Sequence, residues 1–182
     1  MKLNQCKKIL IFGAGHGLGL GFVRAALKFT EGEVHAFYRK ENKAQVLLEI
    51  DNDRLKTYQI DVFNEDTLKA LSSEHKDIDL MLNTIGFLHN EEFGPEKSLR
   101  DIKTDNLLHA FKVNTIVTPL LLKHFRNNFS EIGTYLVLGA KVGSIADNGM
   151  GGWYGYRASK TALNMMIKNI DIEFKRSKKK TR

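Results

Sequence analysis

A run of closely spaced glycines follows directly on the first apolar segment of the chain, and this junction restricts the possible folds more than any other feature. Residues 8–12 read Lys-Ile-Leu-Ile-Phe, the glycine-rich run occupies 13–19, and an amphipathic stretch covers 18–29. A short apolar run that ends in glycines is typical of a buried strand, whereas apolar residues three and four apart favour a helix. The junction therefore predicts a strand, a tight turn and a helix in succession.

The same alternation continues along the 182-residue chain. Short apolar runs predict strands at 8–12, 34–38, 55–60, 80–83 and 134–138. Amphipathic stretches predict helices at 18–29, 42–50, 65–73, 104–127 and 153–176. Alternating strands and helices predict a doubly wound parallel α/β sheet, the Rossmann fold, with right-handed crossovers. Pro119 falls inside the fourth helical stretch, so that helix is expected to be kinked or divided.

Length and composition fit one domain over residues 1–182. The hydrophobic content of 42% is enough for a substantial core, and no shift in composition divides the chain. The single cysteine, Cys6, cannot form an internal disulfide, and the six histidines lack metal-site spacing. We therefore expect a reducing, cytoplasmic setting and no bound metal. No apolar stretch approaches the roughly 20 residues of a membrane helix, so no membrane partner is predicted.

The net charge of +7 comes mainly from a basic tail at 175–182, where six of the residues are Lys or Arg. Removing those six from the 28 basic residues leaves 22, against 21 acidic residues. Cations at the end of a helix are typical of a solvated terminus and suit the negative end of the helix dipole. A nucleic acid or an anionic surface is the less favoured partner.

The glycine-rich run is also able to bind a phosphate. Without Cβ atoms, its glycines let backbone N–H groups approach a pyrophosphate, and the following helix offers the positive end of its dipole. Such runs also occur in plain loops, but this one follows a strand and opens a helix. It does not end in Gly-Lys-Ser/Thr, which argues against a nucleoside-triphosphate P-loop. The candidate cofactor-binding residues of the turn are Gly13, Gly15, His16, Gly17, Leu18 and Gly19.

The end of the second predicted strand should meet the adenosine ribose of a bound dinucleotide. Sites that prefer NAD usually place an acidic residue there to accept from the ribose 2′-hydroxyl. This chain has Tyr38, Arg39 and Lys40 instead. Because two cations would pair with a 2′-phosphate, NADP is preferred over NAD. The alternative is that Arg39 and Lys40 are only solvent-facing loop charges.

Tyr156 and Lys160 are the residues with the most reactive potential. A helix over 153–176 would place them one turn apart on the same face. A neighbouring ammonium favours the phenolate, so we expect the tyrosine pKa to fall from about 10 towards neutrality, where the hydroxyl can exchange protons. Taken alone, the pair also fits an ordinary surface helix, so its interpretation depends on the other motifs.

Together these motifs resemble those of the short-chain dehydrogenase/reductase family, over almost the whole chain. The matching segments are the glycine turn, Asp61-Val62, Asn83-Thr-Ile-Gly86, Val113-Asn114 and Gly151-Gly-Trp-Tyr-Gly-Tyr-Arg-Ala-Ser-Lys160. Two further segments resemble the C-factor-like and sniffer-type carbonyl reductase branch, namely Gly94-Pro95-Glu-Lys-Ser-Leu99 and Val142-Gly-Ser-Ile145.

The resemblance implies catalytic roles for three residues. Tyr156 would be the general acid that protonates a carbonyl oxygen as hydride arrives, or the base in the reverse direction. Lys160 would lower the pKa of Tyr156 and bind the nicotinamide ribose, and Asn114 would hold a water that links Lys160 to solvent. An amide bonding within its own helix is the alternative for Asn114. The substrate would be a small carbonyl or alcohol.

The resemblance also implies further cofactor contacts and a mode of assembly. Asp61 and Val62 would flank the adenine, and Asn83 and Gly86 would lie near the ribose and cofactor backbone. From the sequence alone, Asp61 could equally be the N-cap residue of a helix. Members of the family often form homodimers through the two long helices, here 104–127 and 153–176.

The chain departs from the family pattern in two places. The family supplies a serine at the end of strand five, where this chain has Gly139 and Ala140. Ser144 could replace it if the loop folds back; otherwise Ser144 is a turn residue that bonds local backbone. Family members also continue into two further strands and a substrate-covering region, whereas this sequence stops at Arg182, so we expect a sheet without the last two strands. An impaired or truncated nucleotide-binding or signalling protein is therefore the alternative function.

Overall fold

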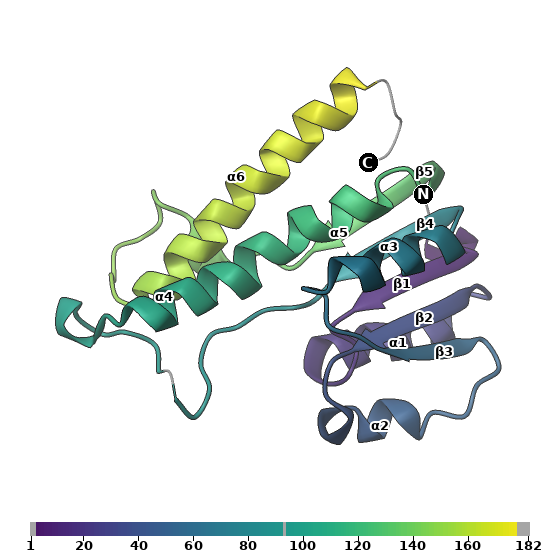
Figure 1. Cartoon of the computed structure of the whole chain (residues 1–182), viewed down its shortest axis with the longest axis horizontal. Helices are drawn as coiled ribbons and strands as arrows, with labels where there is room; N and C mark the ends of the chain where they lie inside the picture. The colour runs from purple at the N-terminus through teal and green to yellow at the C-terminus, as the bar shows by residue number, and fades with distance from the viewer. Residues whose placement is uncertain (1–2, 93, 178–182) are drawn as a thin grey trace.

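The chain forms a five-stranded parallel sheet with helices on both faces (Figure 1). The computed structural model describes residues 3–92 and 94–177. The strands, in the order β3-β2-β1-β4-β5, are β1 Lys8–Phe12, β2 Glu33–Tyr38, β3 Leu55–Gln59, β4 Ile78–Asn83 and β5 Phe129–Val137. All four neighbouring pairs are parallel, which confirms the predicted Rossmann sheet. Within the described ranges there is no sixth or seventh strand.

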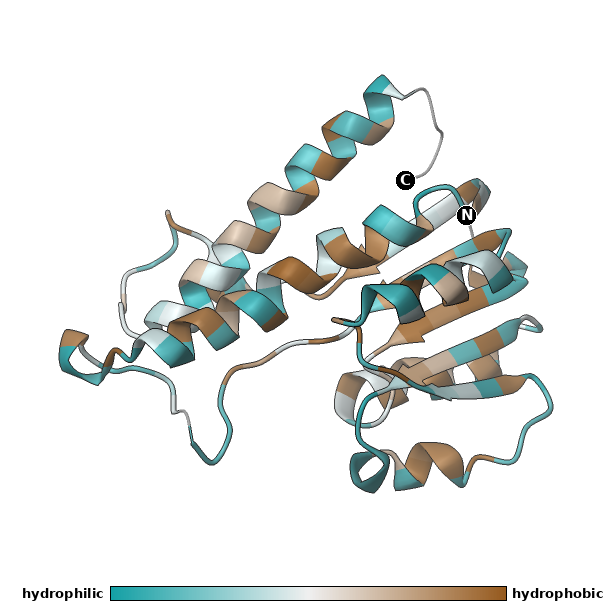
Figure 2. Cartoon of the chain, in the orientation of Figure 1, coloured by the Kyte–Doolittle hydropathy of each residue, from teal (hydrophilic) through white to brown (hydrophobic). Residues whose placement is uncertain are grey.

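Alternate side chains of the strands supply two cores, one on each face of the sheet. Leu10 and Phe12 of β1 face the core that α3 and α5 cover, and Ile9 and Ile11 face the core that α1 covers. The helices are α1 Gly17–Phe29, α2 Gln45–Leu48, α3 Glu65–Glu74, α4 Thr104–Phe111, α5 Val117–Phe125 and α6 Tyr154–Arg176. Figure 2 shows hydrophobic residues concentrated in the central strands, as expected of parallel strands covered on both sides.

The long helix predicted over 104–127 is divided, as the proline suggested. A π-helical turn, Lys112–Ile116, separates α4 from α5 and precedes Pro119. Proline lacks the N–H that would bond to the carbonyl four residues earlier, at Thr115, and its ring crowds that carbonyl. The wider π turn lies at this point, and it contains Asn114.

Several predicted boundaries differ from the structure. The helix predicted over 42–50 is a short 3-10 turn, Glu41–Lys43, followed by the single turn of α2. The last strand begins at Phe129 rather than at residue 134. Its first half contains Ser130 and Glu131, so it lacks the apolar signature of a buried strand. The tail residues 178–182 lie outside the described residues.

Two buried histidines meet between the sheet and α3. The Nε2 atom of His75 lies 3.0 Å from Nδ1 of His35, which is also 3.1 Å from the Tyr58 hydroxyl. The other ring nitrogen of His35 lies 3.3 Å from the Glu33 carboxylate. The pKa of His35 is lowered from 6.5 to about 4, mainly by burial and to a lesser extent by the charge of the neighbouring His75.

This lowered pKa predicts a loss of stability in mild acid. Between pH 6.5 and 4 the unfolded chain takes up a proton at His35 that the folded chain does not, so stability falls as the pH falls. The expected loss between pH 7 and pH 5 is about 2 kcal/mol. Urea unfolding at the two pH values measures it, with His35→Gln as the comparison. An equal pH dependence in wild type and variant would contradict the assignment to His35.

None of the helices among the described residues is long and apolar enough to span a membrane.

Candidate active site at the carboxyl edge of the sheet

The strand ends bring the predicted site residues to one edge of the sheet. Phe12 at the end of β1 pairs with Phe37 of β2 and with Asn83 of β4, and Asn83 pairs with Val137 of β5. The segments that follow these residues therefore leave the sheet side by side, at what we call the carboxyl edge. Ligands of open α/β sheets bind at such an edge.

The glycine turn at this edge is packed too closely for larger residues. Gly13 and Gly17 have φ values of 84° and 56°, which side chains disfavour. A Cβ atom on Gly19 would lie 2.1 Å from the Gly13 carbonyl oxygen and 2.7 Å from the Thr84 hydroxyl. The N–H groups of Gly13 and Ala14 donate to the Phe37 carbonyl, at 3.0 and 2.9 Å. The backbone of the turn is therefore held against β2 and the segment after β4.

The first turn of α1 carries no side-chain cap. His16, the N-cap residue, is exposed and makes no capping hydrogen bond, and Leu18 is 69% exposed. The first N–H groups of a helix have no partner within the helix, so an uncapped first turn suits an anion. Gly15, in contrast, is buried where the turn packs against Tyr38 and Ala44, and a Cβ there would lie 3.4 Å from the Cβ atom of each.

The basic residues after β2 lie beside this turn. Arg39 and Lys40 are both exposed, and Tyr38 is partly buried. The Arg39 carbonyl accepts from the Gln59 side chain at 3.2 Å, which ties the segment to the end of β3. Their exposure is compatible both with a bound 2′-phosphate and with solvent-facing charge.

Asp61 and Val62 occupy the corresponding position after β3. Val62 is buried, and the exposed Asp61 accepts from the Phe63 N–H at 3.0 Å in a local turn. The α3 cap is a different residue, Asn64, which accepts from the Thr67 N–H. Asp61 is thus not the helix cap that its bare sequence allowed.

Asn83 and Gly86 lie on the segment after β4. The buried Asn83 side chain accepts from the Ile85 N–H at 3.0 Å and donates to the Thr118 hydroxyl at 3.1 Å. A Cβ on Gly86 would lie 3.6 Å from Oδ1 of Asn114 and 3.8 Å from Nζ of Lys160. Gly86 therefore lies beside both Asn114, the residue expected to hold the relay water, and Lys160.

Asn114 joins three segments from within the π turn. Its Oδ1 accepts from the Phe87 N–H at 2.7 Å, and its Nδ2 donates to the Phe87 carbonyl at 2.8 Å and to the Ser159 hydroxyl at 3.0 Å. The neighbouring Thr115 hydroxyl donates to the Ser159 carbonyl at 2.8 Å. The side chain of Asn114 thus bonds outside its own helix and fastens α6 to the segment after β4.

Tyr156 and Lys160 lie one turn apart at the start of α6, as their spacing predicted. Lys160 is 3% exposed; its ammonium donates to the Leu138 carbonyl at 2.8 Å and lies 5.9 Å from the centre of the Tyr156 ring. Burial lowers the pKa of Lys160 and raises the pKa of Tyr156. The predicted lowering of the Tyr156 pKa is therefore wrong for this structure, because the ammonium points to a carbonyl and desolvation dominates.

The end of β5 provides no hydroxyl directly. Gly139 and Ala140 follow the Leu138 carbonyl that Lys160 binds. Ser144 is exposed, and its hydroxyl accepts from the Asp147 N–H at 3.3 Å. This contact is the local turn bond that was the alternative for Ser144.

Sequence reasoning missed the residues that hold the site together. Thr84 donates to the Phe12 carbonyl at 2.8 Å, and Ser159 receives the contacts from Asn114 and Thr115. Ser159 could have been found, because it lies three residues after Tyr156 and thus near the same helix face. No cluster of potential metal ligands occurs among residues 3–92 and 94–177.

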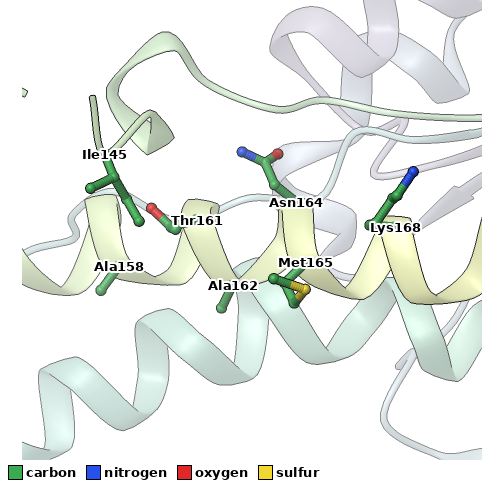
Figure 3. Close-up of a pocket in the computed structure, with 7 residues that line it drawn as sticks. All are labelled: Ile145, Ala158, Thr161, Ala162, Asn164, Met165 and Lys168. Atoms are coloured by element: carbon green, nitrogen blue, oxygen red, sulfur yellow. The ribbon is translucent and has the colours of Figure 1, made fainter. Parts of the chain in front are cut away.

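A separate open groove of about 610 Å³ lies along α6 (Figure 3). It is lined by Ile145, Ala158, Thr161, Ala162, Asn164, Met165 and Lys168. These residues do not include Tyr156 or Lys160, so the groove is distinct from the site described above.

Comparison with known proteins identifies the family. The model of the short chain dehydrogenase family matches residues 7–179. Benzil reductase ((S)-benzoin forming) of Bacillus subtilis is 26% identical over 173 residues, which cover 90% of this chain and 66% of that protein. Short-chain dehydrogenase reductase 3c of Arabidopsis thaliana is 26% identical over 167 residues, or 90% and 62% of the two chains. The chain thus spans about two thirds of the length of these relatives.

Solved structures share the fold. The carbonyl reductase Sniffer of D. melanogaster superposes with a TM-score of 0.83 at 23% identity, covering 93% of this chain and 76% of that one. A Burkholderia multivorans short-chain dehydrogenase/reductase with bound NADP gives a TM-score of 0.82 at 22% identity, covering 97% and 76%. With the glycine turn at the carboxyl edge and Tyr156 and Lys160 on α6, the family match shows that this chain belongs to the short chain dehydrogenase family.

Proposed function

We propose that this protein is an NADP(H)-dependent oxidoreductase that interconverts a small carbonyl compound and its alcohol, in the manner of the C-factor-like and sniffer-type carbonyl reductases. The observation that carries the proposal is the pair Tyr156 and Lys160 on α6, at the same edge of the sheet as the glycine turn. The relative named a benzil reductase supports a carbonyl substrate.

The residues at the carboxyl edge fit a dinucleotide. Gly17 is exposed, and a Cβ there would have no protein atom within 4 Å, so the backbone of the turn is open to a ligand next to the uncapped start of α1. A phosphate gains both the unpaired N–H groups and the helix dipole there. In the proposal, Asp61 and Val62 flank the adenine, and Asn83, Gly86 and Lys160 line the nicotinamide end.

Tyr156 is the residue that donates the proton in carbonyl reduction and accepts it in the reverse reaction. A bound NADP(H) supplies or accepts the hydride. Because burial raises its pKa, Tyr156 keeps its hydroxyl proton at neutral pH and can donate it to the carbonyl oxygen of a substrate. Lys160 holds a positive charge near the resulting phenolate and then returns one of its ammonium protons to it. Asn114, next to Gly86, holds a water that reprotonates the Lys160 amine. Ser144 is the candidate hydrogen-bond donor to the substrate oxygen, since its hydroxyl accepts in the local turn bond with Asp147 and that bond does not use its proton.

Oxidation of NADPH in the presence of carbonyl compounds tests this function. The panel contains benzil, aldehydes and ketones, and the expected result is NADPH consumption that depends on at least one of them. Folded protein without turnover on the whole panel would contradict the reductase. If calorimetry then shows that NADPH still binds, an impaired nucleotide-binding or signalling protein is favoured, and the absence of a hydroxyl at Gly139 and Ala140 supports that alternative.

The preference for NADP rests on Arg39 and Lys40. Replacing both by alanine is expected to weaken NADPH binding by roughly tenfold or more and to leave NADH binding unchanged, because charged hydrogen bonds to a 2′-phosphate are lost. Calorimetry with each nucleotide measures the effect. Lys43→Ala, which removes an exposed cation nearby, is the control. Equal weakening of NADPH and NADH would contradict a role in 2′-phosphate recognition.

The proposal extends to assembly and setting. Apolar side chains are exposed along the two long helical segments, among them Leu108 at 63%, Ile116 at 43% and Met165 at 62%. Burying such a surface favours association, so we include a homodimer through α4, α5 and α6. Sedimentation equilibrium should give twice the 20.7 kDa chain mass, and a monomer at every concentration would exclude the dimer. The single, buried Cys6 supports a reducing, cytoplasmic setting.

A further inference from the structure

A buried carboxylate joins the loop before α4 to the start of α6. Glu96 is only 3% exposed, although it belongs to the polar loop after β4. Its Oε1 accepts from Nδ2 of Asn106 in α4 at 2.6 Å, and its Oε2 accepts from the N–H of Gly155 in α6 at 3.2 Å. A carboxylate is buried at low energy only where donors satisfy it, so this site is specific for an acceptor with two oxygens.

The start of α6 depends on this carboxylate because it has no cap of its own. Trp153, the N-cap residue, has a left-handed conformation with φ 50° and makes no side-chain capping bond. The second helical residue, Gly155, then has an N–H without a partner in the helix. Glu96, 59 positions earlier in the chain, supplies the acceptor. Its negative charge also lies at the positive end of the helix dipole.

A main-chain hydrogen bond and close packing accompany this contact. The Trp153 N–H donates to the backbone carbonyl of Glu96, so both the main chain and the side chain of this residue bind the start of α6. A Cβ on Gly155 would lie 3.1 Å from Oε1 of Glu96 and 3.2 Å from the Leu107 side chain. The first turn of α6 therefore lies directly against α4, with the carboxylate between them.

We propose that Glu96 is a positioning residue that holds the first turn of α6, and with it the Tyr156 hydroxyl, in the place required for proton transfer. The inference rests on the proposed reductase function. Tyr156 directly follows Gly155, so a shift of that peptide moves the hydroxyl. Lys160 is held separately, by the Leu138 carbonyl. Loss of Glu96 therefore changes the position of Tyr156 relative to Lys160 and leaves the glycine turn intact.

Glu96→Ala tests the proposal, with Glu92→Ala as the matched control, because Glu92 is an exposed carboxylate in the same loop. For Glu96→Ala we expect kcat to fall by roughly tenfold or more, since misplacement of a reacting group by about 1 Å costs up to 10²-fold. NADPH affinity should stay within about twofold of wild type, because the phosphate site is unchanged. Hydrogen exchange at the Gly155 amide should accelerate, while exchange in α1 stays the same. Glu92→Ala should change none of these quantities.

A second pair of variants separates positioning from folding. Glu96→Gln keeps the size of the side chain but replaces one carboxylate oxygen by an amide NH₂ group. That group faces the N–H donor of either Asn106 or Gly155. Asn106 can turn its own oxygen to the new amide only if it gives up its 3.3 Å bond to the Gly94 carbonyl. Adding Asn106→Asp restores a donor and an acceptor at the contacts of residue 96 with residue 106 and with the Gly155 N–H, and loses only the longer bond to the Gly94 carbonyl. The double variant should therefore recover most of the kcat that Glu96→Gln loses. A purely structural role predicts that folded Glu96→Gln keeps the wild-type kcat and that only its stability falls and is recovered in the double variant.

The outcomes are distinct. Unchanged kcat in Glu96→Ala together with faster exchange at Gly155 would overturn the proposal, and so would equal losses of kcat and NADPH affinity in Glu96→Gln. If the wild-type protein has no turnover, the reductase function fails on its own, and exchange at the Gly155 amide still decides whether Glu96 holds the start of α6.

Discussion

Tyr156→Phe is expected to reduce kcat for carbonyl reduction by about a thousandfold, because the variant lacks the hydroxyl that protonates the substrate oxygen. General acid catalysis by a positioned side chain contributes about 10²- to 10⁴-fold. The phenyl ring keeps the packing of Tyr156 against Trp153, where the two ring centres are 6.2 Å apart, so the fold should be retained. NADPH oxidation with the best carbonyl substrate measures kcat, and calorimetry measures cofactor affinity.

Tyr154→Phe is the matched control. It makes the same chemical change two residues earlier in the same helix, at a side chain that is 36% exposed. It should leave kcat within about twofold of wild type, since surface substitutions away from the core and from buried polar contacts have small effects. A Tyr156→Phe protein that is folded, binds NADPH and turns over at the wild-type rate would remove Tyr156 from the mechanism.

Gly19→Ala is expected to destabilise the protein by about 2 kcal/mol or more. It is also expected to weaken NADPH binding by roughly tenfold or more. The added Cβ would lie 2.1 Å from the Gly13 carbonyl oxygen, which belongs to the backbone and cannot rotate away. Either the turn or α1 must then move, and the backbone N–H groups proposed to bind the pyrophosphate move with it. Urea unfolding measures the stability, and calorimetry measures the affinity.

Gly21→Ala provides the comparison within the same helix. A Cβ at Gly21 would have no heavy atom within 4 Å, and alanine favours a helix by about 1 kcal/mol over glycine. This variant should be as stable as wild type or more stable, with unchanged NADPH affinity. If Gly19→Ala matches Gly21→Ala in both measurements, the tight packing of the turn has no role in cofactor binding.

Elements whose signals are local were predicted well. β1 and the start of α1 follow from five consecutive strand residues and the glycines after them, and the predicted bounds of β1 are those of the structure. The division of the helix near Pro119 follows from the missing N–H of one residue. α2 and the first half of β5 were predicted poorly, because their extent depends on neighbouring strands and loops rather than on their own apolar pattern.

Within the site, the sequence by itself determined which residues share a helix face, since the spacing of Tyr156 and Lys160 is a property of the helix alone. The tertiary structure decided their electrostatics. It buries Lys160, directs its ammonium to the Leu138 carbonyl and raises the pKa of Tyr156 instead of lowering it. It also decided that Glu96 caps α6, because burial and hydrogen bonding across 59 residues depend on how the chain folds in space, which local spacing does not encode.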